Sequence, residues 1–110
     1  MSRHVNNAKQ ISMRVRPVLR KYGIKKAILF GSFATGRQTL KSDVDLVLIQ
    51  DTDKRYFDRF EGILRDLYEA IRGRDIEVFI YTPEELDRIS HRKFIQNVLR
   101  EGQVIYESPP

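Results

Sequence analysis

Hydrophobic and polar positions along the chain alternate between helical and strand-like patterns. Residues 5–22 place apolar side chains three and four positions apart, which predicts an amphipathic helix that ends at Gly23. Residues 27–30 and 43–50 predict strands that are joined by a polar, glycine-containing loop. A single helical turn can form in this loop after Ser32. We therefore expect helix, strand, loop and strand in the first half of the chain.

The second half of the chain continues this alternation of helices and strands. Residues 51–53 form a turn with the composition of a helix N-cap, and we expect a helix from there to about residue 72. Residues 75–81 predict a third strand, and residues 82–85 have the Thr-Pro-Glu-Glu composition of a helix start. The helix before that strand is expected to face the core with an apolar stripe of Phe57, Phe60, Leu64, Leu67 and Ile71.

The predicted elements follow the order α-β-β-α-β-α-α-β, with a last helix over about 92–101 and a short strand at 104–106. This order predicts an α/β fold in which a small mixed sheet of three to four strands is covered by helices. There is no internal repeat and no linker long enough to divide the chain. Residues 1–110 are therefore predicted to form a single domain.

Composition narrows the class of protein without identifying its chemistry. The chain has 41% hydrophobic and 32% charged residues, no cysteine, and no apolar run near the roughly 20 residues of a membrane span. We therefore expect a cytoplasmic protein without disulfides, thiolate metal sites or contact with a membrane. The net charge of +5 favours anionic partners such as nucleotide, RNA or an acidic protein surface. Charge alone is not evidence for nucleic-acid binding, because a solvated arginine-rich surface gives the same balance.

Two carboxylates, Asp43 and Asp45, stand at the start of an otherwise apolar strand. Residues two apart in a strand point to the same face, so these groups repel each other and lose solvation. A hard cation such as Mg²⁺ removes the repulsion, because it takes oxygen ligands from carboxylates, water and substrate phosphates. Two such ions hold the attacking and leaving oxygens of a phosphoryl or nucleotidyl transfer. The alternative is that one aspartate caps the preceding turn and the other pairs with an arginine.

Gly31 and Ser32 follow the first predicted strand directly. Glycine has no Cβ, so a phosphate can approach the backbone, and a serine can cap a short turn whose N–H groups attract phosphate. The pair is a weak signal alone, since both residues are common in turns and no Gly-Lys-Ser/Thr of a Walker loop follows. Its position gives it weight, because Asp43 and Asp45 follow after a spacer of ten residues.

The stretch LFGSFATGRQTLKSDVDLVLI resembles the signature of the minimal nucleotidyltransferases, small members of the DNA polymerase beta superfamily. Their pattern of Gly-Ser, ten residues and Asp-x-Asp fits without a gap, and the similarity extends to a Gly-x-x-x-Tyr-Glu sequence near the C-terminus. The resemblance implies the nucleotidyltransferase fold, binding of ATP with two Mg²⁺ ions, and transfer of a nucleotidyl group to a hydroxyl with loss of pyrophosphate. It implies that Gly31 and Ser32 hold the triphosphate and that Asp43 and Asp45 hold the metals.

One position inside the motif departs from the family. Minimal nucleotidyltransferases often have arginine between the alanine and the second glycine, where this chain has Thr35, and Arg37 follows Gly36. Arg37 or Lys41 can supply the phosphate-binding charge instead. The alternative is that both are ordinary exposed cations.

The resemblance also implies a third acid on a later strand, which completes one metal site and helps to deprotonate the acceptor hydroxyl. Asp75 and Glu77 fall on the same face of the strand predicted at 75–81. Glu77 matches better by its spacing from the following Thr-Pro-Glu, whereas Asp75 is expected in a surface ion pair with Arg72 or Arg74. Glutamate replaces the more usual aspartate, and Mg²⁺ has strict geometry. Glu77 is therefore either a ligand or base, or the transfer is slow or lost.

A chain of this length resembles a catalytic core and little more, so the acceptor or a partner must supply recognition. Minimal nucleotidyltransferases are commonly paired with a HEPN-domain toxin, and the resemblance implies an antitoxin that adds AMP to a tyrosine of that toxin. One alternative is a catalytically weak or inactive nucleotidyltransferase-fold antitoxin that neutralises its partner by binding. Another is a small-molecule nucleotidyltransferase. A homo-oligomer is a further alternative, because a small sheet can leave an edge strand uncovered.

Overall fold

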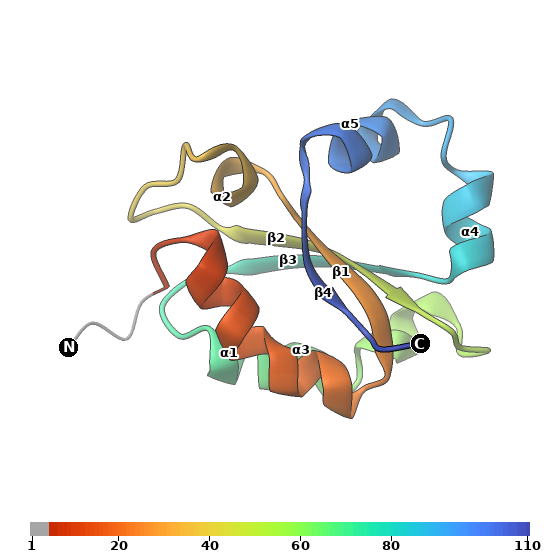
Figure 1. Cartoon of the computed structure of the whole chain (residues 1–110). Coiled ribbons are helices and arrows are strands. Elements are labelled where there is room, and N and C mark those ends of the chain that lie inside the picture. The colour runs from red at the N-terminus through yellow and green to blue at the C-terminus, as the bar shows by residue number, and fades with distance from the viewer. Residues whose placement is uncertain (1–4) are drawn as a thin grey trace.

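A computed structural model describes residues 5–110, and its centre is one four-stranded mixed sheet (Figure 1). The strands lie in the order β3-β2-β1-β4. Strand β1 is antiparallel to both β2 and β4, whereas β2 and β3 are parallel. Their bounds are β1 (Ile24–Phe30), β2 (Val44–Gln50), β3 (Ile76–Tyr81) and β4 (Gln103–Glu107). The predicted α/β fold with a small mixed sheet is confirmed.

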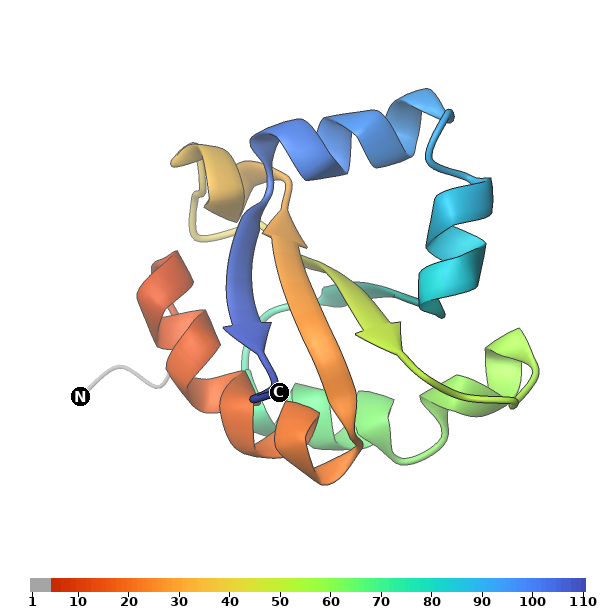
Figure 2. The same ribbon diagram turned by 45° about the vertical axis from the view of Figure 1, so that its right-hand side comes forward.

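Helices cover the sheet unevenly. The helices are α1 (Ala8–Lys21), α2 (Ser32–Thr35), α3 (Ile63–Ala70), α4 (Pro83–Arg88) and α5 (Lys93–Glu101), with a short 3-10 helix η1 (Tyr56–Phe60). Helices α1 and α3 lie side by side along one part of the sheet, and α2 and α5 flank the end of β1 (Figures 1 and 2). Within residues 5–110, no helix is both long enough and apolar enough to cross a bilayer.

The main hydrophobic core lies between the sheet and the layer of α1 and α3. Alternate residues of β2, namely Val44, Leu46 and Leu48, are fully buried there. Residues on the other face of the sheet form a smaller cluster of Ile28, Val47 and Val98, with half-buried Phe30, Phe79 and Tyr81 packed against it. Because side chains alternate along a strand, Asp45 shares this second face with Val47.

The helix predicted from residues 51–53 to about residue 72 is wrong in its extent. Backbone at 51–55 is not helical, η1 follows, and α3 begins only after Gly62. Gly62 has a φ of 80°, and a Cβ there would lie 2.6 Å from the Tyr22 hydroxyl, so the chain turns sharply at this glycine. Phe57, predicted to face the core, is consequently 85% exposed, whereas Leu67 and Ile71 are buried as predicted and Leu64 is half-buried.

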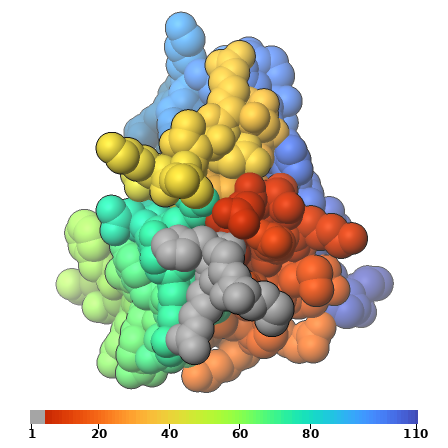
Figure 3. Space-filling model, turned by 90° about the vertical axis from the view of Figure 1, so that its left-hand side faces the viewer, coloured from red at the N-terminus to blue at the C-terminus, as the bar shows by residue number. Residues whose placement is uncertain are grey.

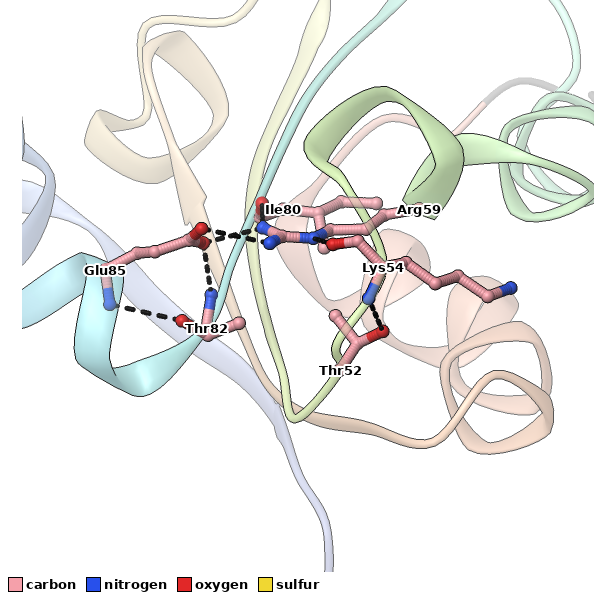
Figure 4. A network of polar contacts seen from close by, with 6 residues as sticks. All are labelled: Thr52, Lys54, Arg59, Ile80, Thr82 and Glu85. Atoms are coloured by element: carbon pink, nitrogen blue, oxygen red, sulfur yellow. Dashed lines mark hydrogen bonds and ion pairs between the residues drawn. The ribbon is translucent and has the colours of Figure 1, made fainter.

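The helix start predicted at residues 82–85 is confirmed. Thr82 Oγ1 accepts a hydrogen bond from the Glu85 N–H, and the Glu85 carboxylate accepts one from the Thr82 N–H, which is a complete capping box. The same carboxylate forms two hydrogen bonds with the buried Arg59 guanidinium, at 2.6 and 2.9 Å (Figure 4). Arg59 also donates to the carbonyl oxygens of Ile80 and Lys54, so it joins η1 to β3 and α4.

Candidate active site

The strand register brings Asp45 and Glu77 together. Parallel pairing of β2 with β3 places Asp45 opposite Glu77, and antiparallel pairing of β1 with β2 places Phe30 opposite Asp45. Gly31 therefore follows β1 directly beside the Asp45 carboxylate. A Cβ at Gly31 would overlap the Asp45 Oδ2, and the backbone there has a φ of 74° and a ψ of −152°. Only glycine adopts this conformation readily, and only glycine leaves room for the carboxylate.

The Asp45 carboxyl is half-buried, and its protonation reflects its surroundings. Burial raises its pKa to about 6, repulsion from Glu77 and a hydrogen bond with Glu77 add to the rise, and the charge of Asp43 contributes least. Two neighbouring carboxylates in a partly desolvated place are unfavourable unless a proton or a cation lies between them. The pair is thus suited to bind a hard cation, which is the chemistry expected from Asp-x-Asp.

Asp43 lies just before β2 and is exposed. The start of β2 is hydrogen-bonded to the residue that precedes β3, because the Val44 N–H donates to the Asp75 carbonyl oxygen at 2.9 Å. Within residues 5–110, Asp43, Asp45 and Glu77 do not form a group of three metal ligands. The structure thus brings Asp45 and Glu77 together and leaves Asp43 apart. Two carboxylates still fit Mg²⁺, which in proteins uses one or two carboxylates with waters and substrate phosphates.

The loop between β1 and β2 contains the other predicted site residues. The single helical turn predicted after Ser32 is present as α2, which ends at Gly36 in a left-handed conformation with a φ of 74°. Ser32 is half-buried, whereas Arg37 and Lys41 are exposed. The Thr35 hydroxyl lies 3.4 Å from the carbonyl oxygens of Gly31 and Ser32, so it points back into this turn. Phosphate binding by Gly31, Ser32, Arg37 and Lys41 stays a prediction.

Arg74, which the sequence analysis did not assign to the site, holds this loop in place. Its buried guanidinium donates to the carbonyl oxygens of Thr39 and Ser42, both at 2.9 Å, and to that of Val5 at 2.8 Å. It also lies 4.8 Å from the centroid of the Phe33 ring. Figure 3 shows the result, with the loop (yellow) packed against the segment that precedes β3 (teal).

The surface ion pair predicted for Asp75 is not formed among the described residues, because Arg74 turns inward to these carbonyls. Arg72 remains exposed. A buried arginine that bonds only to backbone carbonyls leaves no pattern of charged partners in a sequence. Nothing in the sequence therefore distinguished Arg74 from Arg72.

Comparison with known proteins identifies the family. Residues 14–110 match the family described as Polymerase beta, Nucleotidyltransferase. The chain belongs to this nucleotidyltransferase family. Two Methanocaldococcus jannaschii relatives, MJ0604 and MJ0435, are each named "Putative protein adenylyltransferase". MJ0604 is 35% identical over 93% of this chain and all of its own length, and MJ0435 is 31% identical over 68% of this chain and 78% of its own length.

Solved structures share the fold of this family. A chain from a crystal structure of a toxin–antitoxin with AMP-PNP superposes with a TM-score of 0.67 and 20% identity, covering 88% of this chain and 73% of that one. A chain from the complex of tri-AMPylated Shewanella oneidensis HEPN toxin with MNT antitoxin gives a TM-score of 0.61 and 16% identity, covering 92% and 73%. At these identities the likeness shows the fold alone. The predicted nucleotidyltransferase fold is confirmed.

Proposed function

We propose that this protein is a Mg²⁺-dependent adenylyltransferase that moves AMP from ATP to a tyrosine of a HEPN-domain toxin and acts as its antitoxin. The observation that carries the proposal is the Asp45–Glu77 carboxylate pair beside Gly31, where the missing Cβ leaves room for the Asp45 carboxylate. The names of the Methanocaldococcus jannaschii relatives support protein adenylylation as the reaction. The toxin–antitoxin complexes among the structures of the same fold support a HEPN-domain protein as the acceptor.

The triphosphate binds at the turn between β1 and β2 in this proposal. The backbone N–H groups of Gly31 and Ser32 and the Ser32 hydroxyl are the proposed donors, because both residues follow β1 directly and Gly31 lies beside the Asp45 carboxylate. Arg37 and Lys41 are exposed cations on the loop that follows. Their charges attract the outer phosphates and the departing pyrophosphate.

The three acids have two proposed roles, metal binding and proton transfer. Asp43, Asp45 and Glu77 are the proposed ligands, and bound Mg²⁺ supplies the positive charge that offsets the phosphates and the developing negative charge. Asp43 is exposed and lies on the backbone two residues before Asp45, so its side chain is free to approach a ligand that ATP brings. Glu77 is the proposed base for the acceptor hydroxyl, because it is exposed beside Asp45 at the open face of the sheet.

The transfer is a single displacement at the α-phosphorus. The tyrosine oxygen forms a bond to the α-phosphorus while the bond from that phosphorus to the α,β-bridging oxygen breaks. Pyrophosphate leaves with the bonding electron pair, and the phenolic proton passes to Glu77. The products are an AMP ester of the tyrosine and pyrophosphate, with no oxidant or further reactant required.

Intact-protein mass spectrometry tests this proposal. The purified chain is mixed with Mg²⁺, ATP and the HEPN-domain protein encoded beside it, and the modified residue is then mapped by peptide sequencing. We expect AMP on a tyrosine of the partner, lost in Asp43→Asn/Asp45→Asn and kept in Asp53→Asn, which changes an exposed acid outside the site. A stable complex without an adduct under any nucleotide would contradict transfer and support an antitoxin that acts by binding. An adduct on a small molecule instead would support the small-molecule alternative.

A further inference from the structure

A small hollow of about 180 Å³ opens beside Gly31, and the proposed reaction gives it no role. Its lining residues come from the end of β1 and from α5, two elements that lie next to each other in Figures 1 and 2. One wall comes from the end of β1 and the other from α5. The lining residues are Phe30, Gly31, Phe94, Asn97, Val98 and Glu101.

Phe94 gives the hollow a fixed aromatic wall. Its ring packs edge-on against Phe30, with centroids 5.5 Å apart, and lies 5.2 Å from the Phe79 ring. These two contacts hold the ring in position. Phe94 is nevertheless 40% exposed, so part of the ring is open to a ligand without any rearrangement of the core.

Polar groups lie on the same helix, one and two turns further along. Asn97 and Glu101 are four residues apart, which places them on one side of α5. The Asn97 Oδ1 accepts a hydrogen bond from the Arg100 guanidinium at 2.7 Å, which fixes the orientation of the amide. An aromatic wall with an amide and a carboxylate at its rim matches a flat heterocycle that has a π face and an edge of donors and acceptors.

We propose that this hollow receives the base of the bound nucleoside triphosphate and that Phe94 stacks on it. This proposal rests on the proposed function, because that function places the triphosphate at Gly31 and Ser32. Gly31 lines the hollow itself, so a nucleoside attached to a phosphate at Gly31 is already at its mouth. The volume suits one ring system and not a whole nucleotide, so the phosphates stay outside over the carboxylate pair.

Calorimetric titration with Mg²⁺ complexes of ATP, GTP, CTP, UTP and inorganic tripolyphosphate tests the base pocket. Phe94→Ala is compared with Phe57→Ala, a matched control at an aromatic residue that is 85% exposed on η1. Stacking acts on the π face that every base has, so we expect Phe94→Ala to bind all four nucleotides about 5- to 150-fold more weakly. Tripolyphosphate affinity should not change, and Phe57→Ala should bind every ligand as the wild type does.

Phe94→Leu provides a second variant, because it keeps an apolar contact with Phe30 and Phe79 and removes only the π face. Nucleotide affinities that are unchanged in both Phe94 variants would overturn the base pocket while leaving the proposed function intact. Equal losses for nucleotides and tripolyphosphate would also overturn it, since the site as a whole would then be disturbed. Slower AMP transfer at unchanged nucleotide affinity would assign the hollow to the acceptor. A wild type that binds neither ATP nor tripolyphosphate would refute both proposals.

Discussion

The most informative substitution is Gly31→Ala, with Gly36→Ala as its matched control. Both glycines have a φ of 74°, so alanine is strained at either position. A Cβ at Gly36 meets nothing within 4 Å, whereas one at Gly31 overlaps the Asp45 carboxylate. Gly36→Ala therefore measures backbone strain, and Gly31→Ala measures backbone strain together with displacement of Asp45.

The expected magnitudes follow from the backbone angles. Gly36 is in the left-handed helical region, where a non-glycine residue costs about 1–2 kcal/mol. Gly31, with a ψ of −152°, lies in a region that is essentially restricted to glycine, so we expect a loss of about 1–3 kcal/mol in the free energy of unfolding. The Asp45 carboxylate can rotate away from the new methyl group, but it then leaves its place beside Glu77. Gly31→Ala should therefore weaken ATP binding by more than its loss of folding stability explains.

Urea denaturation followed by circular dichroism gives the free energies of unfolding, and calorimetry gives the affinity for Mg·ATP. We expect Gly36→Ala to bind ATP as the wild type does and Gly31→Ala to bind it weakly or not at all. The stability loss of Gly31→Ala should also be smaller in an Asp45→Ala background, because the overlap is then gone. Equal ATP affinities for Gly31→Ala and Gly36→Ala would contradict a displacement of Asp45, as would strict additivity of Gly31→Ala and Asp45→Ala.

Three further substitutions test other parts of the structure by urea denaturation. The pKa of Asp45 is about 6 in the folded protein in place of 3.8, so the free energy of unfolding falls as the pH rises through this range. The full shift corresponds to a loss of about 3 kcal/mol, and because the carboxyl is partly exposed to solvent we expect a loss of about 1 kcal/mol. Without metal, Asp45→Asn should therefore be about 1 kcal/mol more stable than the wild type at pH 8 and equal to it below pH 4. Arg59→Ala leaves Glu85 without its partner and should cost about 2–4 kcal/mol. Arg59 is the largest cause that lowers the pKa of Glu85 to about 2, so the wild type should lose stability as the pH falls from 4.5 towards 2, and Arg59→Ala should lose less over the same range. Arg74→Lys cannot reach three carbonyls at once, and we expect a loss of about 1–3 kcal/mol together with weaker ATP binding.

The main elements of the fold follow from local patterns. The apolar strands, the capped helix after β3 and the turn after Ser32 are determined by short-range spacing and by capping residues, which a sequence displays directly. The predicted extent of the helix before β3 was wrong, and the reason is also local. Phe57 has the spacing of a core residue, but Gly62 breaks the helix and leaves Phe57 in solvent.

The site could be predicted only in part, because its geometry depends on long-range pairing. Spacing and the family resemblance predicted Asp43, Asp45 and Glu77 as site residues, but the approach of Glu77 to Asp45 requires parallel pairing of β2 and β3, which no local pattern specifies. The overlap that makes glycine necessary at position 31 likewise depends on the register of β1 and β2. Arg74 was missed because its partners are backbone carbonyls, which are the same at every position of the sequence.

We expect this site to transfer the α-phosphate of ATP, with its adenosine, to a protein hydroxyl. The decisive experiment incubates the chain and the HEPN-domain protein that we propose as its partner with ATP labelled at the α-phosphorus and, in parallel, with ATP labelled at the γ-phosphorus. We expect label on the partner from α-labelled ATP alone, with labelled pyrophosphate released from γ-labelled ATP, and neither in Asp43→Asn/Asp45→Asn. Label on the partner from γ-labelled ATP, or no label from either while the two proteins form a complex, would contradict it.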